Sequence, residues 1–225
     1  MCSSDLTAVL VAGLGADVTV AGRSAQRLEE TQALLPGSAA VSVDVSDHAA
    51  LTAALTAARP DHVVLSTGAA YYNTIRDLEI EPAAEFIRDR FVTPLVIGKW
   101  IAAECPALSS LTIVGGIILK RPVVGAAAWS FAGPGVLGLV ETLALELAPT
   151  RVNTIAPGFV ADSPMNARLQ GAQAADDQRR HLEQVLPTKR TVTVADCARQ
   201  ILAVMTDPAV TGTKRDVDGG HALIA

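Results

Sequence analysis

Short apolar runs alternate with alanine-rich, helix-type runs along the whole of this 225-residue chain, and this alternation constrains the fold most. The run HVVLS at residues 62–66 is almost continuously apolar, as strands covered on both faces are. Such strands in regular alternation with helices predict an α/β fold, a doubly wound parallel sheet flanked by helices. Because no linker, repeat or low-complexity block interrupts the pattern, we expect residues 1–225 to form a single domain.

The local signals also predict where the elements lie. Strands are expected at residues 17–21, 40–45, 62–66, 111–114, 151–155 and 215–217. Helices are expected at residues 24–35, 46–59, 82–104, 134–149 and 194–205. Ser46 is expected to cap the second of these helices, and Pro134 to lie in the first turn of the fourth. The polar residues 162–186 predict a mobile segment that contains helix.

The N-terminal residues allow two interpretations. Residues 6–14 form the first helix, or residues 7–12 (TAVLVA) form a strand. Parallel neighbours need a crossover of roughly a dozen residues, and the strand interpretation leaves too few before the next strand. We therefore favour the helix.

Composition and charge exclude several classes of protein. Half of the residues are hydrophobic and 18% are charged, so the chain can bury a core and is not disordered. A net charge of -5 without a basic stripe argues against nucleic-acid binding. Residues 122–140 are apolar, but they hold two prolines and four glycines and favour a buried turn and helix over a membrane span. Without a signal-peptide pattern, a cytoplasmic location is expected.

The cysteines and histidines carry no further motif. The three cysteines, Cys2, Cys105 and Cys197, form no CxxC pair and have no histidine at ligand spacing. We expect reduced thiols and no metal site. The four histidines have no serine or cysteine partner that local spacing identifies, so the sequence does not support a hydrolytic triad.

Five segments carry a resemblance to a known family. They are VTVAGRS at 18–24, VDVSD at 43–47, STGAA at 66–70, LALELAPTRVNTIAPGFV at 143–160 and VTGTKRDVDGGHALI at 210–224. In this order and spacing, the chain resembles the short-chain dehydrogenase/reductase family from about residue 15 to its end. The resemblance implies a Rossmann-like NAD(P)-binding domain with sheet order 3-2-1-4-5-6-7 and a dinucleotide across the carboxyl ends of its strands. It also implies a homodimer or homotetramer, with residues 162–186 closing over a small-molecule substrate.

The resemblance assigns residues to the cofactor. Arg23 follows the second strand, where a guanidinium beside the Ser24 hydroxyl suits the 2′-phosphate of NADP(H). The alternative is a solvated surface arginine. The other matching positions are Asp44 and Val45 at the adenine ring, Thr67, Gly68 and Ala69 along the cofactor, and Pro157, Gly158 and Val160 at the nicotinamide carboxamide. The glycines among them also suit turns at strand ends.

The first phosphate-binding loop departs from the family pattern. The family opens with a strand and a TGxxxGxG loop that hold the pyrophosphate. Here Gly13 and Gly15 supply a GxG, but Val18 and a strand follow instead of a helix, so the fingerprint fails in its context. We expect the chain to be a truncated or misannotated form of a longer protein, with weakened cofactor binding.

The catalytic positions depart as well. The family uses a Tyr as proton donor, a Lys four residues later, a preceding Ser and an Asn in the long helix. Counted back from LALELAP, these positions hold Trp129, Gly133, Gly116 and about Arg90. The two tyrosines, Tyr71 and Tyr72, have no lysine four residues on, so no YxxxK exists in the chain. The family's usual proton relay is expected to be absent.

Two functions remain open. An atypical NADP(H)-dependent oxidoreductase would reduce or oxidise a small carbonyl or alcohol compound through a non-classical site. There Arg90 and Trp129 are the catalytic candidates, and an inward Arg90 would stabilise a negative oxygen. Tyr71 and Tyr72 lie near the expected substrate entrance. The alternative is a non-catalytic relative, a binding or oligomer-assembly subunit, in which Arg90 pairs with Asp89 or Glu85 and the tyrosines anchor a loop.

Overall fold

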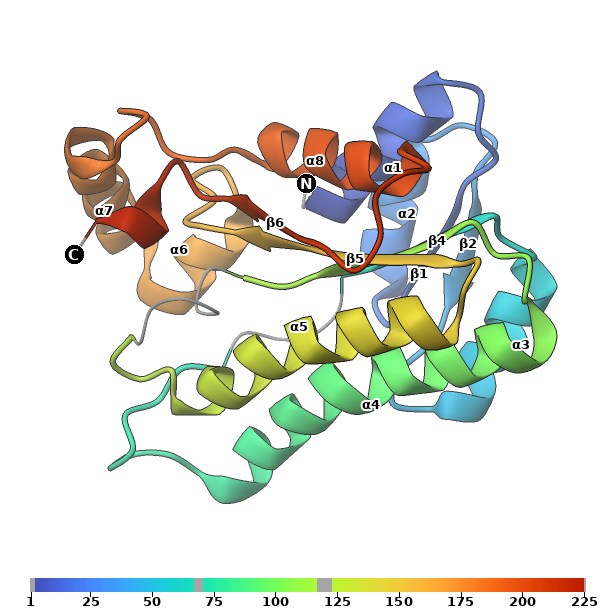
Figure 1. The fold of residues 1–225 in the computed structure, drawn as a ribbon. Coiled ribbons are helices and arrows are strands. Elements are labelled where there is room, and N and C mark those ends of the chain that lie inside the picture. Colours follow the sequence, from blue (N-terminus) through green and yellow to red (C-terminus); the bar gives the residue numbers. More distant parts are fainter. Residues whose placement is uncertain (1–2, 67–70, 117–122, 225) are drawn as a thin grey trace.

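The structure is a computed structural model, and it describes residues 3–66, 71–116 and 123–224 (Figure 1). Helices and strands alternate over most of this length, as the sequence predicts. In chain order the elements are α1 (Ser3–Gly13), β1 (Thr19–Gly22), α2 (Ala25–Ala33), β2 (Ala39–Ser42), α3 (His48–Ala58), β3 (His62–Leu65), α4 (Ile80–Glu104), β4 (Ser110–Val114), α5 (Ala127–Glu146), β5 (Arg151–Pro157), α6 (Pro164–Gln170), α7 (Ala172–Val185), α8 (Val194–Thr206), β6 (Lys214–Val217) and the 3₁₀ turn η2 (His221–Leu223).

The six strands pair in parallel, but in two sheets. One sheet has the order β1-β2 and the other has the order β3-β4-β5-β6. With the family's first strand left out, this is the order that the resemblance implies. The strands form two sheets because no strand among the described residues pairs with both β1 and β3.

The N-terminal residues form the helix α1, which confirms the favoured interpretation and makes the strand alternative wrong. The helix is followed by a turn in which Gly15 has a φ of 90°, a conformation suited to glycine. Leu6 packs against the cluster of buried side chains between α8 and the sheet, and Thr7 is buried. Packing against α8 therefore gives this segment its place in the fold.

Helices cover both faces of the larger sheet. Figure 1 shows α4 and α5 side by side on one face and α1 and α8 on the other. Leu111 of β4 and Val152 of β5 are fully buried in the main core. Helix α5 is long and apolar enough to cross a membrane by length and composition, a test that core helices also pass, and here it packs against α4 and β5.

Two expected helix ends are wrong. Helix α5 begins at Ala127, seven residues before Pro134, because Ala128 and Trp129 are buried against α4 and tertiary packing extends the helix. The N-cap of α3 is Asp47 instead of Ser46: Asp47 Oδ1 accepts a hydrogen bond from Ala50 N at 3.0 Å. Ser46 does not cap α3, because its hydroxyl donates a hydrogen bond to Asp44 at 2.8 Å.

Candidate active site

The first part of the site lies at the carboxyl ends of β1 and β2. Arg23 directly follows β1, and its Nη1 lies 3.5 Å from Oδ2 of Asp44, which follows β2. Side-chain exposures of 66% and 42% mean that this ion pair adds little stability. An anionic ligand can therefore replace the carboxylate beside the guanidinium at small cost.

The neighbouring Ser24 suits an anion, whereas Asp44 carries a negative charge of its own. Ser24 is the N-cap of α2, and its Oγ accepts a hydrogen bond from Arg27 N at 3.3 Å while its O–H remains a donor. Hydrogen bonds from the backbone and hydroxyl of Ser46 lower the pKa of Asp44 below its ordinary value. Val45 is half-buried and packs against the main core, which fixes this strand end.

Helix α4 brings a second carboxylate towards this region. Burial and the charge of Glu85 raise the pKa of Asp89, the charge of Asp44 raises it further, and Arg23 opposes both. These electrostatic interactions show that Asp89 lies near the ends of β1 and β2. The sequence gives no sign of this, because Asp89 is distant from both strands along the chain.

The second part of the site is a cluster of aromatic rings around Arg90. The Arg90 guanidinium carbon lies 4.6 Å from the ring centroid of Trp129 and 5.5 Å from that of Phe86. Its Nη1 donates to the carbonyl of Val114 at 3.5 Å, so the side chain points inward, as the catalytic hypothesis requires. Burial lowers the pKa of Arg90 to about 10, which keeps the group cationic at neutral pH.

Trp129 is 8% exposed and packs with its ring centroid 4.7 Å from that of Phe86 and 5.8 Å from that of Tyr72. Within the described parts of the chain its indole Nε1 is buried without a hydrogen-bond partner. An unmade bond of this kind costs about 1–3 kcal/mol. This N–H is the only polar group of the indole, so any polar role of Trp129 must use it.

The two tyrosines behave differently. The Tyr71 hydroxyl donates to the carbonyl of Glu79 and accepts from its N–H, both at 3.0 Å, which confirms the loop-anchor interpretation for Tyr71. Tyr72 is 39% exposed. Burial raises the pKa of Tyr72, and the positive charge of Arg90 opposes this rise.

The other two expected catalytic positions hold glycines. Gly116 follows β4, and a Cβ placed on it meets no atom of the described residues within 4 Å. Gly133 lies one turn beyond Trp129 in α5. Of the expected cofactor contacts, Thr67, Gly68 and Ala69 lie outside the described residues.

The end of β5 is tightly packed against the end of β6. Pro157 is the last residue of β5, and Gly158 N donates to Val217 O at 2.9 Å. A Cβ on Gly158 would lie 3.0 Å from the Cα of Asp218, so a side chain here would need the Asp218 backbone to shift by a few tenths of an ångström. Val160 is buried and bridges to Val192.

The expected substrate segment contains the helices α6 and α7. A shallow groove of about 170 Å³ lies there, and its polar lining residues include Ser163, Asn166 and Arg179. The segment is tied down at its start, because Oδ1 of Asp162 accepts a hydrogen bond from the N–H of Val194 at 2.7 Å. Its mobility stays a prediction.

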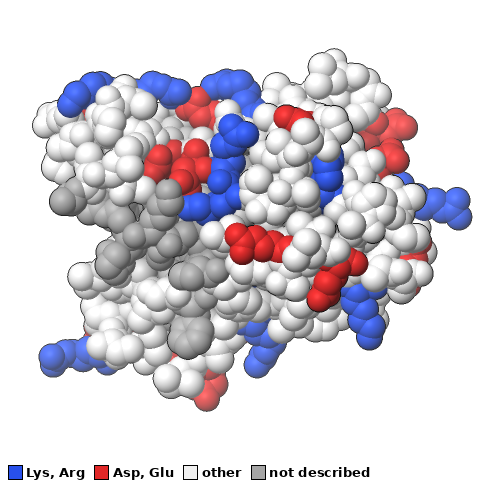
Figure 2. Space-filling model, in the orientation of Figure 1, with Lys and Arg blue, Asp and Glu red and all other residues white. Residues whose placement is uncertain are grey.

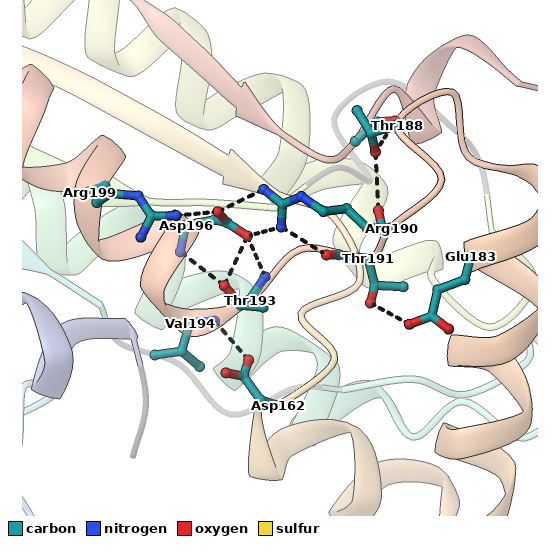
Figure 3. Close-up of polar contacts among 10 residues, drawn as sticks. Asp162, Glu183, Thr188, Arg190, Thr191, Thr193, Val194, Asp196 and Arg199 are labelled. Carbon is teal, nitrogen blue, oxygen red and sulfur yellow. Dashed lines mark hydrogen bonds and ion pairs between the residues drawn. The ribbon is translucent and has the colours of Figure 1, made fainter.

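Figure 3 shows a polar network that holds the far end of this segment to α8. The Asp196 carboxylate accepts from Nη1 and Nη2 of Arg190 at 2.7 and 2.9 Å and from Arg199 at 2.5 Å. Thr193 and Asp196 also form a capping box at the start of α8. Sequence reasoning missed this network, although the T-x-x-D pattern at residues 193–196 signals the capping box.

The surface charges are mixed. On the face drawn in Figure 2, acidic and basic side chains are interspersed. This fits the small net charge of -5.

Known proteins share both the sequence pattern and the fold. The family model described as Enoyl-(Acyl carrier protein) reductase matches residues 5–222. A short-chain dehydrogenase/reductase of Acremonium is 31% identical over 168 residues, which are 72% of this chain and 62% of that protein. A second one, of Stachybotrys chlorohalonatus, is 29% identical over 94% of this chain and 89% of its own length.

One similar structure is the NADPH-bound short chain oxidoreductase from Pseudomonas aeruginosa PAO1 that contains an atypical catalytic center. Its TM-score is 0.87 at 24% identity, over 100% of this chain and 94% of that one, and this likeness shows a shared fold. The family model spans nearly the whole chain. The chain belongs to the short-chain dehydrogenase/reductase family, whose members are NAD(P)-dependent oxidoreductases.

Proposed function

We propose that the protein is an NADP(H)-dependent oxidoreductase that acts on a small carbonyl or alcohol compound through a site without the family's usual Tyr, Lys, Ser and Asn. The observation that carries the cofactor choice is Arg23, an exposed guanidinium at the end of β1. A guanidinium binds phosphate with two parallel hydrogen bonds. The similar structure from Pseudomonas aeruginosa contains NADPH, which supports the same cofactor here.

The donor chemistry of this chain fits such a cofactor. Arg23 and the Ser24 hydroxyl would hold the 2′-phosphate, next to the N-terminus of α2. Asp44 and Val45 would lie at the adenine ring. The nicotinamide carboxamide would lie against residues 157–160 at the end of β5.

Arg90 and Trp129 are the proposed catalytic residues. When bound, a reduced nicotinamide supplies a hydride to the carbonyl carbon, and negative charge develops on the carbonyl oxygen. The cationic Arg90 stabilises that charge in a buried site, and the buried Nε1 of Trp129 donates a hydrogen bond to it. A preorganised donor of this kind is worth about 2.7–4 kcal/mol in a transition state.

The test of the cofactor compares NADPH with NADH. Binding is measured by quenching of tryptophan fluorescence in the wild type and in Arg23→Ala, with Arg27→Ala, an exposed arginine one turn along α2, as the matched control. Loss of an exposed charge-assisted hydrogen bond is expected to weaken NADPH binding by about tenfold and to leave NADH binding unchanged. Equal loss in Arg27→Ala, or no NADPH binding by the wild type, would refute the assignment.

A second function is favoured by one observation. The residue at the expected proton-donor position is an indole, Trp129, which holds a buried place in an aromatic cluster and cannot release a proton near neutral pH. A non-catalytic subunit for binding or oligomer assembly would bind NADPH without oxidising it across a panel of carbonyl compounds. A homodimer or homotetramer in the cytoplasm, without nucleic-acid or membrane partners, stays a prediction.

A further inference from the structure

We propose that Tyr72 is the proton donor of this site and that Arg90, besides stabilising the negative oxygen, supplies the positive charge beside Tyr72. The two residues replace the family's Tyr and Lys from different parts of the fold. This inference rests on the proposed function. It concerns the source of the proton, which Arg90 and Trp129 cannot supply near neutral pH.

The phenol of Tyr72 lies beside Trp129, the residue at the family's tyrosine position. The rings of Tyr72 and Trp129 have centroids 5.8 Å apart and planes inclined by 33°. Trp129 stands at the family's tyrosine position in α5, whereas Tyr72 approaches from the segment between β3 and α4. The site therefore keeps an ionisable hydroxyl beside residue 129, although the sequence has no YxxxK.

Exposure and bonding separate Tyr72 from its neighbour. The Tyr71 hydroxyl is occupied by both backbone groups of Glu79, and its ring stacks on Phe86 at 6.3 Å between centroids. Tyr72 is 39% exposed, so its side chain is accessible to a ligand and to water. Of the two tyrosines, Tyr72 is therefore the more exposed, and the hydroxyl of its neighbour is already engaged by backbone groups.

Arg90 supplies the positive charge that the family takes from lysine. Its guanidinium carbon lies 4.6 Å from the Trp129 ring centroid, on the ring that Tyr72 also contacts. Burial raises the pKa of Tyr72, which keeps the phenol protonated at neutral pH, and the charge of Arg90 lowers the same pKa. The phenolate that remains after proton transfer is thereby stabilised.

The proposed step adds one hydride and one proton to the carbonyl group. The hydride arrives at the carbonyl carbon from the reduced cofactor, and the C=O π electron pair moves to oxygen. The O–H bond of Tyr72 breaks, and its proton forms the new O–H bond of the alcohol. The Tyr72 phenolate then takes a proton from water, so one carbonyl group is reduced for each cofactor oxidised and one proton consumed.

The activity test uses a matched pair of variants. NADPH oxidation is followed with diacetyl, methylglyoxal and phenanthrenequinone for the wild type, Tyr72→Phe and Tyr71→Phe. Loss of a proton donor is expected to lower kcat by about 100-fold or more in Tyr72→Phe. Tyr71→Phe loses the same hydroxyl outside the site and is expected to stay within about threefold of the wild-type kcat, with lower thermal stability.

A second readout needs no turnover. The phenol of Tyr72 is titrated by its ultraviolet absorbance, as the difference between proteins with Tyr72 and with Tyr72→Phe. Arg90→Met is expected to raise the pKa of this phenol, and Arg90→Lys is expected to restore it in part, because a positive charge returns. The pH profile of kcat should shift in the same direction.

The outcomes distinguish the two proposals. Wild-type rates in Tyr72→Phe, or a phenol pKa unchanged by Arg90→Met, would overturn the role of Tyr72 and leave the cofactor assignment standing. NADPH binding without turnover of any dicarbonyl would overturn it too and favour the non-catalytic subunit. Failure to bind NADPH would refute the proposed function, and the role of Tyr72 with it.

Discussion

Replacement of Asp196 by alanine tests whether one carboxylate holds the loop before α8 to the first turn of that helix. Asp196 is buried, and its side chain accepts hydrogen bonds from the N–H and hydroxyl of Thr193, both at 2.9 Å, as well as from two arginines. Asp196→Ala removes the carboxylate half of the capping box and keeps the bond from Asp196 N to the Thr193 hydroxyl. The part-buried N–H of Thr193 is left without its acceptor, which costs about 1–3 kcal/mol.

The exposed arginine partners add little to this cost. We therefore expect Asp196→Ala to lower the free energy of unfolding by about 2 kcal/mol, and the melting temperature by about 4–8 °C for a chain of this size. Urea unfolding followed by circular dichroism measures the first quantity, and a thermal scan measures the second. Asp177→Ala, which removes an exposed helix ion pair with Arg180, is the matched control and should change neither.

The same residue predicts a pH dependence. Hydrogen bonds from Arg190 hold the pKa of Asp196 well below its ordinary value of 3.8. Its stabilising effect is then complete above the unfolded-state pKa and is lost as the pH falls below about 4 towards the folded-state pKa. The stability difference between wild type and Asp196→Asn should shrink in that range. A difference that is unchanged by acid, or an Asp196→Ala protein as stable as its control, would refute this account.

Two further predictions concern the sheet. Burial and the charge of Arg151 lower the pKa of His62, so the unfolded chain binds a proton more readily than the folded protein. The folded state therefore loses stability as the pH falls below about 6.5. His62→Gln should remove this loss in thermal scans, and a melting temperature that falls equally with pH in wild type and variant would contradict the prediction. Gly158→Ala should destabilise the fold by about 1–3 kcal/mol because the added Cβ meets the backbone of Asp218. Unchanged urea unfolding would argue against that contact. Gly138→Ala is the control, because a Cβ there meets no atom of the described residues within 4 Å.

Element order could be predicted because its signals are local. The apolar run at residues 62–66 and the proline after Arg59 mark a strand and a helix end without knowledge of the rest of the chain. The start of α5 could not be predicted, because the burial of Trp129 against α4 extends the helix and outweighs the local signal of Pro134. The separation of β1 and β3 into different sheets could not be predicted from either strand alone, because strand pairing depends on two segments at once.

The sequence by itself determined the family, the alternation of strands and helices, and the loss of YxxxK, since each of these is written in neighbouring residues. Only the tertiary structure decided that Arg90 turns inward onto Trp129, and that the Tyr71 hydroxyl is engaged by Glu79 while Tyr72 is exposed. These contacts join residues from separate turns, strands and helices. Their geometry depends on how the elements pack, and side-chain types and spacings alone do not contain that information.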